Sequence, residues 1–288
     1  MEKRYNRELK KLKRKRFIRR VLILSIVFIF IFMTIIYPLF NINIRRYELK
    51  KSKLPQSFNN YKIIHVSDLY LKGGDNLSKL KDVIAGAEPN LVVFTGNTFT
   101  REDPNYYEEF IKMKDEISES LIFYIARGET ELELDEDYSS KLFNKMKYHG
   151  IYLIEEEKIA LNKGGEMIAV RSIESNKKDY KTQSDDLNIK SSIKFDKKEF
   201  NLVLSHNPSY ASDLSKKGVD LILSGHRNGG WIRLPFLGGL SYDWDSKFKE
   251  DDYILGQSLL IVSRGTGIKN GKFRLFNTKE VNEIILKR

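Results

Sequence analysis

Five side chains of types that commonly bind ligands follow short apolar runs of this sequence, at points where a strand would end. They are Asp68, Asn97, Glu129, His206 and His226. In α/β sheets, ligands gather at the carboxyl ends of strands, because the loops there present side chains from several elements. The spacing therefore predicts one site that combines two imidazoles, two carboxylates and an amide.

Composition and charge exclude several kinds of chemistry and partner. The chain contains no cysteine, so a thiol nucleophile, a zinc–thiolate site and a disulfide are all excluded. Eleven of the fifty lysine and arginine residues lie within residues 1–20, against Glu2 and Glu8, so this arm carries +9 of the +11 net charge. A nucleic-acid-binding domain carries its basic patch on the folded part. We therefore expect no nucleic-acid partner.

The elements that must position these side chains alternate between strands and helices. Apolar runs that end in polar residues or glycine predict strands at 62–68, 90–96, 121–126, 151–156, 201–206, 219–226, 258–265 and 272–277. Amphipathic stretches predict helices at 76–87, 106–117 and 139–150. Residues 171–198 are rich in Ser, Lys and Asp and are expected to form a solvated loop. The alternation indicates an α/β domain over residues 61–288.

Residues 21–40 form an uncharged apolar segment behind the basic arm of residues 1–20. A helix of this length spans about 30 Å, the thickness of a hydrocarbon core. A buried core helix would keep a polar stripe, and a signal peptide would have a shorter apolar region with a small-residue cleavage site. We interpret the segment as a single transmembrane helix. The basic arm predicts a cytoplasmic N-terminus and an extracytoplasmic globular domain at the cell membrane.

Residues 41–60 join this anchor to the domain. Several charges, Pro55 and an Asn pair predict a short polar tether. Its basic residues are expected to lie against anionic lipid headgroups.

Four segments occur in an order typical of one protein family: HVSDLYL, FTGNTFT, YIARGETE, and LSHNPS with LSGHRNGGWIRLPFLGG. Over about residues 60–286 the chain resembles the calcineurin-like metallophosphoesterases, in particular a membrane-associated branch with SDLHL, TGD, GNHE, LSHNP and SGHTHGGQIRLPF. The resemblance implies an α/β fold, a four-layer sandwich of two mixed β-sheets flanked by helices, here preceded by the one transmembrane helix. It also implies two divalent metals that activate a water for attack on a phosphate ester.

The first metal position of that family is changed at most of its ligands. Asp68 matches a family ligand, but Tyr70 and Asn228 stand where the family has histidines, and Asn97 replaces the bridging Asp. Thr130 replaces the family histidine that assists near the leaving group. Because one good ligand remains, we expect no ion at this position and no two-metal centre.

The second metal position would draw on Asn97, Glu129, His206 and His226. Glu129 replaces a family Asn and restores the negative charge lost with the bridging Asp. Two imidazoles, a carboxylate and an amide oxygen suit one divalent ion of manganese, zinc or iron. A metal-free relic is equally open, with Arg127 or Arg227 paired to Glu129 or Asp68.

Three functions are compatible with this pattern. The first is a pseudoenzyme that binds a phosphorylated lipid, another envelope component or a partner protein at the outer membrane face, with at most weak phosphoesterase activity. The second is a phosphoric ester hydrolase with one metal that acts on a lipid-headgroup or envelope phosphate ester. The third is a structural interaction module that makes contacts through residues 171–198. The loss of the family residues at the first metal position favours the pseudoenzyme.

Two other histidines have structural interpretations. His65 lies inside a predicted strand and is expected to be a packed strand histidine. His149 ends a predicted helix beside Gly150, where an imidazole can meet the terminal carbonyls.

Overall fold

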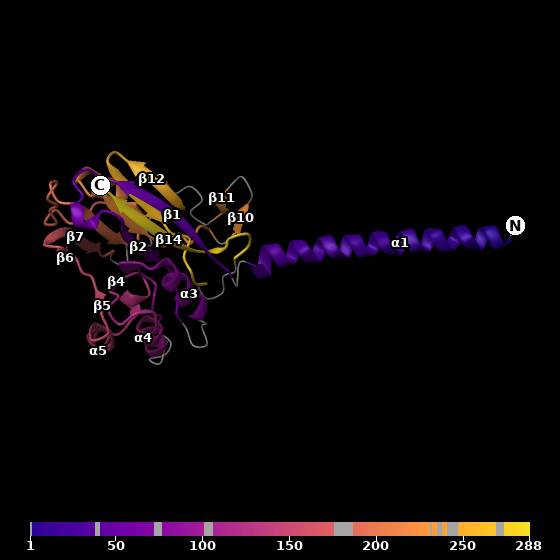
Figure 1. Ribbon diagram of the computed structural model, residues 1–288, viewed down its shortest axis with the longest axis horizontal. Coiled ribbons are helices and arrows are strands. Elements are labelled where there is room, and N and C mark those ends of the chain that lie inside the picture. Colours follow the sequence, from indigo (N-terminus) through magenta and orange to yellow (C-terminus); the bar gives the residue numbers. More distant parts are fainter. Residues whose placement is uncertain are drawn as a thin grey trace.

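The structure is a computed structural model of the whole chain. It describes residues 2–37, 41–71, 77–100, 106–175, 187–230, 232–234, 238–240, 247–268 and 274–288. Figure 1 shows an α/β domain from which a single long helix projects. The chain termini lie far apart, with the N-terminus at the free end of this helix.

The first sheet brings the carboxyl ends of three site-bearing strands to one edge. Its order is β1-β14-β2-β3-β4-β5, with bounds Ile42–Lys50, Lys279–Lys287, Tyr61–Val66, Leu91–Thr95, Phe123–Ala126 and Ile151–Leu153. β2 to β5 are parallel, whereas β14 runs antiparallel to β2 and parallel to β1. β2 and β3 are nearly continuous apolar runs because both of their faces are covered.

The second sheet has a similar plan. Its order is β12-β13-β9-β8-β7-β6, with bounds Asp251–Leu255, Ser258–Val262, Leu221–Ser224, Asn201–Ser205, Glu166–Ile173 and Ile159–Lys163. The four inner strands are parallel, and the two outer strands are antiparallel to their neighbours. A separate small hairpin consists of β10 (Ile232–Leu234) and β11 (Gly238–Leu240).

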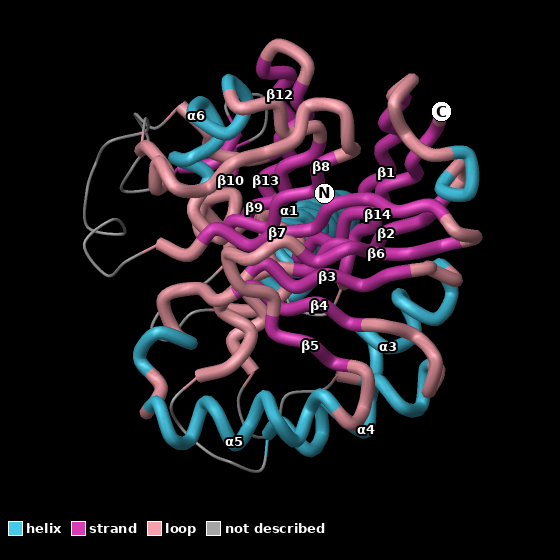
Figure 2. Tube along the Cα trace, turned by 90° about the vertical axis from the view of Figure 1, so that its left-hand side faces the viewer, coloured by secondary structure: helices cyan, strands magenta, loops and turns pink. Residues whose placement is uncertain are grey.

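Hydrophobic packing divides the domain into four layers. Ile63 belongs to the core between the two sheets, while its neighbour Ile64 belongs to the core under the helices, because successive strand residues point to opposite faces. The helices on the first sheet are α3 (Ser78–Ala87), α4 (Tyr106–Ile117) and α5 (Glu136–Lys147). The second sheet is covered by α6 (Ala211–Lys216), which Figure 2 shows on the opposite side of the domain. The predicted α/β sandwich of two mixed sheets flanked by helices is confirmed.

The predicted tether is wrong over much of its length. Residues 42–50 form β1, which pairs along all nine residues with β14, from Ile42 opposite Lys279 to Lys50 opposite Lys287. The charged residues that suggested a tether are side chains of an edge strand, and charges are common on such strands because they discourage further pairing. The globular fold therefore begins at Ile42.

Three further predictions differ from the structure. Residues 171–173 are the end of β7, so the predicted solvated loop begins later than expected. Residues 187–198 are irregular and mostly exposed, as predicted, although Ile189 and Ile193 are buried under the second sheet. The described part of 272–277 makes only an isolated bridge at Leu275, and the closing strand is β14 instead. The predicted helix at 139–150 begins earlier, since Asp135 caps it by accepting a bond from Tyr138 N at 3.1 Å.

The projecting helix is α1 (Glu2–Ile31), continued by a π-helical turn at Phe32–Ile36. It is the single helix among the described residues whose length and composition would let it cross a membrane. Most of its large apolar side chains are exposed, including Phe28 and Phe30. The last three residues of the predicted span, 38–40, lie outside the described part of the chain.

Candidate functional site

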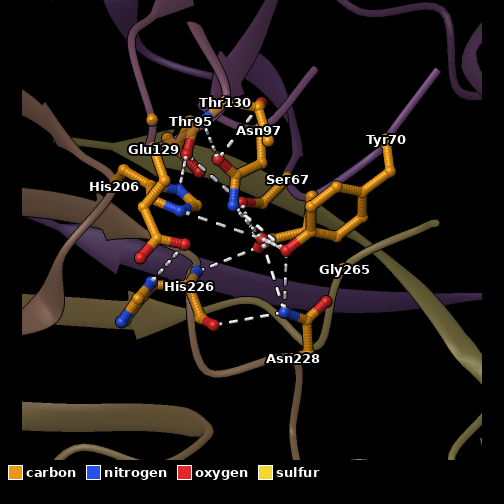
Figure 3. A network of polar contacts seen from close by, with 12 residues as sticks. Ser67, Tyr70, Thr95, Asn97, Glu129, Thr130, His206, His226, Asn228 and Gly265 are labelled. Atoms are coloured by element: carbon orange, nitrogen blue, oxygen red, sulfur yellow. Dashed lines mark hydrogen bonds and ion pairs between the residues drawn. The ribbon is translucent and has the colours of Figure 1, made fainter. Parts of the chain in front are cut away.

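All eight side chains of the predicted site, changed family positions included, come together at the carboxyl edge of the sheets. Figure 3 shows Tyr70, Asn97, Glu129, Thr130, His206, His226 and Asn228 from several loops converging on one small region. Asp68 is at its centre and is completely buried. The expectation that these residues lie close together therefore holds, although their arrangement differs from a metal site.

The Asp68 carboxylate is surrounded by hydrogen-bond donors of the protein. Its Oδ1 accepts bonds from Tyr70 Oη at 3.0 Å, Asn97 Nδ2 at 3.1 Å and Asn228 Nδ2 at 3.4 Å. Its Oδ2 accepts bonds from Ser67 Oγ at 2.8 Å and from the backbone N–H of His226 at 2.9 Å. A carboxylate offers about four lone-pair positions. Five donors therefore saturate this one.

The Tyr70 hydroxyl acts as a neutral donor. It donates a hydrogen bond to Asp68 Oδ1, and it accepts hydrogen bonds from Asn97 Nδ2 at 3.0 Å and from Asn228 Nδ2 at 3.3 Å. Burial of the ring, together with the nearby Asp68 charge, raises the pKa of Tyr70 well above its usual value. The phenol therefore keeps its proton at physiological pH and donates it in the hydrogen bond to Asp68.

The orientation of the Asn97 amide is fixed by a backbone group. Its Oδ1 accepts bonds from Thr130 N at 3.0 Å and from Thr130 Oγ1 at 3.3 Å. A backbone N–H can only donate, so the oxygen must face Thr130 and the NH₂ group must face Asp68 and Tyr70. The oxygen that the predicted single-ion site requires is thus turned away from the centre of the site.

The Asn228 amide is held in the same manner. Its Nδ2 donates to the backbone carbonyl of His226 at 3.1 Å as well as toward Asp68 and Tyr70. A carbonyl oxygen can only accept, so the nitrogen again faces the centre. Two amide nitrogens therefore stand where the family presents a carboxylate oxygen and an imidazole.

The two histidines and Glu129 form the other side of the site. His206 Nδ1 lies 2.5 Å from the carbonyl oxygen of Thr95, which assigns the proton to Nδ1, and His206 Nε2 lies 3.8 Å from Asp68 Oδ1. The rings of His206 and His226 meet edge to face with centroids 5.3 Å apart. His226 Nδ1 is 4.0 Å from Glu129 Oε2. These three side chains are adjacent, but they do not point at one common centre.

Glu131, which sequence analysis did not select, holds the two central loops together. Its buried carboxylate accepts backbone N–H bonds from Asn97 at 2.9 Å, Thr98 at 2.6 Å, Phe99 at 2.9 Å and Gly128 at 2.8 Å. Close approach of the loops also requires glycine, because a Cβ at Gly128 would lie 2.5 Å from Asn97 N. The signal in the sequence was the final Glu of YIARGETE, at the position of the last letter of the family's GNHE.

Backbone strain is concentrated at the same place. Asp68, Tyr70, Asn97, His226 and Asn228 have φ angles of 51°, 48°, 53°, 70° and 52°, in the left-handed region. Asp and Asn tolerate this region, whereas for a bulky residue such as Tyr70 it costs about 1–2 kcal/mol. Strain of this kind persists where the surrounding structure demands it, and it clusters at functional sites.

His65, His149 and Arg127 each have a defined partner in the structure. His65 is fully buried and bonded through Nε2 to Thr95 Oγ1 at 2.8 Å, which confirms a packed strand histidine. His149 does not cap its helix through the ring, since Nδ1 lies 2.8 Å from Asp115 Oδ2. Arg127 pairs with Glu174 at 2.9 Å rather than with Asp68 or Glu129.

The donor set does not fit the metal centre that the family implies. Within the described ranges, no three or more histidine, aspartate or glutamate side chains are grouped so that they could hold an ion. The N–H and O–H groups of Asn97, Asn228 and Tyr70 point at Asp68 from positions where a cation would need lone pairs. A cation there would face protons.

Comparison with known proteins decides the family. Residues 61–227 match the calcineurin-like phosphoesterase family. The chain belongs to this family. One relative is YkuE of Bacillus subtilis (strain 168), an uncharacterized metallophosphoesterase that is 24% identical over 249 residues. The match covers 83% of this chain and 83% of YkuE. An uncharacterized metallophosphoesterase of Aquifex aeolicus (strain VF5) is 25% identical over 253 residues, which are 85% of this chain and 92% of the relative.

Two solved structures match part of the chain. SoxB, a sulfate thiohydrolase of Thermus thermophilus, matches with a TM-score of 0.45 and 12% identity, over 81% of this chain and 57% of that one. A 5′-nucleotidase precursor from the same organism matches with a TM-score of 0.41 and 14% identity, over 71% and 48% of the two chains. This calcineurin-like phosphoesterase chain spans about half the length of those structures.

Proposed function

We propose that this protein is a membrane-anchored pseudoenzyme of the calcineurin-like phosphoesterase family, which binds a phosphate-bearing ligand at the edge of the sheets around the Asp68 site without hydrolysing it. The observation that carries the proposal is the saturated Asp68 carboxylate, whose five donors all belong to the protein. The two-metal reaction of the family depends on cations that activate a water and stabilise the developing charge. A ring of N–H and O–H donors supplies neither effect.

A buried guanidinium supplies the positive charge near Asp68. Arg274 is almost completely buried and donates to the carbonyls of Arg264 and Gly267 at 2.8 Å. A Cβ at Gly265 would lie 2.8 Å from Asp68 Cβ and 3.3 Å from Arg274 Nη2, so one glycine separates the two charged side chains. Burial lowers the pKa of Arg274 to about 10, which still leaves it charged at neutral pH. This arginine balances a charge that metal ions balance elsewhere in the family.

The exposed apolar surface of α1 supports a membrane anchor, and the basic arm before it supports a location of the domain outside the cytoplasm. Exposed Phe, Ile, Leu and Val side chains cover its apolar half, and such a surface is stable in lipid rather than in water. The basic arm before it favours a cytoplasmic N-terminus, so the domain acts outside the cytoplasm at the cell membrane. Its ligand would then be a phosphorylated lipid or another envelope component.

Metal stoichiometry of the full chain in detergent tests this function without knowledge of the ligand. The purified protein is loaded with manganese, zinc or iron, desalted and measured by elemental analysis. We expect no ion above the level of a metal-free control protein and no turnover of a generic phosphate diester. The matched variant Tyr70→His/Asn97→Asp/Asn228→His restores the family residues at the first metal position and should bind metal, which shows that the assay detects a site.

Elemental analysis would contradict the proposal if it found a bound ion. About one tightly held ion in the natural chain, lost in His226→Ala, would refute the proposal that the Asp68 site holds no metal. It would instead support the hydrolase with a single metal.

A further inference from the structure

The candidate site lies at the edge of the domain from which the membrane helix emerges. β1 begins at Ile42, and Ile42 pairs with Lys279 at the start of β14. Because β14 is antiparallel to β2 and pairs Asn282 with His65, the end of β2 that leads to Asp68 is beside the start of β14. β3 and β4 are parallel to β2, so Asn97 and Glu129 lie at the same edge.

The length of the connection keeps this edge near the helix. Tyr37 is the last helical residue described, and β1 starts five residues later. Five extended residues reach at most about 17 Å. The backbone N–H of Asn41 also bonds to the Tyr37 carbonyl at 3.1 Å, which shortens the reach further. The edge that carries the site therefore faces the bilayer that α1 would cross.

One loop joins the helix to the site directly. The backbone N–H of Phe276 donates to the Thr34 carbonyl at 3.2 Å, and Thr34 is buried although most of the described helix is exposed. The next residue, Asn277, donates through Nδ2 to the Asn228 carbonyl at 2.7 Å. Asn228 in turn points its amide at Asp68. The contact with the helix and the contact with the site are thus made by neighbouring residues.

This loop reaches along the apolar part of the helix. The Phe276 ring meets the Phe30 ring edge to face, with centroids 5.9 Å apart. Phe30 lies seven residues before Tyr37, which is about 10 Å along a helix axis. Phe30 lies inside the predicted span of residues 21–40, so a side chain that contacts it must itself enter the bilayer.

Apolar residues of the β10–β11 hairpin lie beside the loop. Ile232 bridges to Leu275, and Arg233 N donates to the Leu275 carbonyl at 2.9 Å. Figure 1 shows β10 and β11 on the side of the domain next to α1. Ile232, Leu275 and Phe276, which we call the membrane-side rim, are all partly exposed.

We propose that the membrane-side rim enters the lipid interface beside α1, so that the edge of the domain that carries the Asp68 site lies at the level of the lipid headgroups. The inference rests on the membrane anchor proposed above and narrows the ligand to one presented by the bilayer. Apolar side chains gain free energy when lipid covers them, and aromatic rings are favoured at the membrane–water interface. The occupant of the rim is the bilayer rather than a second protein, because the rim is continuous with an apolar helix that itself requires lipid.

The absence of natural cysteine allows a direct test on the full chain. Single-cysteine variants Phe276→Cys and Ile232→Cys carry an environment-sensitive fluorophore in vesicles of phosphatidylcholine and phosphatidylglycerol. Gln257→Cys is the matched control, because the β12–β13 turn lies at the opposite end of the second sheet. Phe28→Cys reports on the anchor itself. Thermal unfolding of each labelled protein confirms that it is folded.

We expect several-fold weaker quenching by aqueous iodide at Phe276→Cys and Ile232→Cys than at Gln257→Cys, with strong quenching by nitroxide-labelled lipid. If Phe28→Cys is quenched by the lipid nitroxide while both rim labels behave like Gln257→Cys, the rim proposal is overturned and the anchor stands. If Phe28→Cys is not quenched by the lipid, the anchor fails and the rim proposal fails with it. Rim labels shielded from iodide yet unaffected by the lipid nitroxide would show a protein contact and also overturn the proposal.

Discussion

Replacing Asn97 by aspartate reintroduces the carboxylate of the family and tests whether protein donors have taken the place of metal ions. In the natural chain, Asn97 Nδ2 donates to Asp68 Oδ1 at 3.1 Å, while Oδ1 faces Thr130. Asn97→Asp keeps the acceptor toward Thr130 and converts the donor into a second buried oxygen. Two carboxylates at this separation repel each other by about 5 kcal/mol at an effective dielectric constant of 20.

Proton uptake limits the cost of this repulsion. Neutralising one carboxyl group at pH 7 costs about 4 kcal/mol, since its unperturbed pKa is about 3.9 and each pH unit is worth about 1.4 kcal/mol. This is less than the repulsion, so the pair should share a proton and the variant should lose about 4 kcal/mol of unfolding free energy at pH 7. The folded variant then binds more protons than the unfolded chain. Its stability deficit should therefore shrink by about 1.4 kcal/mol for each pH unit lowered toward 4.

Denaturant unfolding of the full chain in detergent measures this deficit between pH 4 and pH 8. Asn97→Ala removes the same donor without adding charge, and its deficit should not change with pH. The double variant Asp68→Asn/Asn97→Asp exchanges the two groups and should recover part of the lost stability. Manganese or zinc should also stabilise Asn97→Asp, because a cation can now bridge two carboxylates. A stability equal to that of the natural chain, with no dependence on pH or metal, would refute the network described around Asp68.

Two further predictions concern buried groups close to the site. Glu131→Gln should cost about 4 kcal/mol, because each carboxylate oxygen accepts two backbone N–H bonds and either orientation of the amide leaves two buried donors without an acceptor. The exposed Glu133→Gln in the same turn should unfold like the natural chain, and equal midpoints for both variants would contradict the role given to Glu131. Burial lowers the pKa of His65 to about 3, so the unfolded chain binds a proton between about pH 6.5 and pH 3 that the folded chain does not. Stability should fall as the pH falls through this window, by about 1.4 kcal/mol per unit attributable to His65. His65→Gln should lack this contribution, and an unchanged slope of unfolding free energy against pH would show that His65 is not held neutral.

The strand and helix pattern of the domain could be predicted from sequence because burial requires it locally. β2, β3, β8 and β9 are covered on both faces, so their sequences are apolar runs that need no knowledge of their partners. The polar residues that follow such runs were likewise placed correctly at one edge, since parallel strands end together. The motif order then indicated the family.

The edge strand β1 could not be predicted in this way. Its sequence is charged and resembles a linker, and its conformation depends on β14, whose residues lie more than two hundred positions later in the chain. The short antiparallel strands β6 and β12 were missed for the same reason, because half-exposed strands depend on a neighbour more than on their own composition.

The sequence alone determined which residue types meet around Asp68, because the ends of buried strands fix their positions. Only the tertiary structure decided what they do there. The direction of the Asn97 amide depends on the backbone N–H of Thr130, and that of Asn228 on the carbonyl of His226. Hydrogen-bond direction is set by groups brought together from different loops, so residue types that suit one metal ion became a set of donors around a carboxylate. The same holds for the contact of Phe276 with Phe30, which joins two ends of the chain and places the site beside α1.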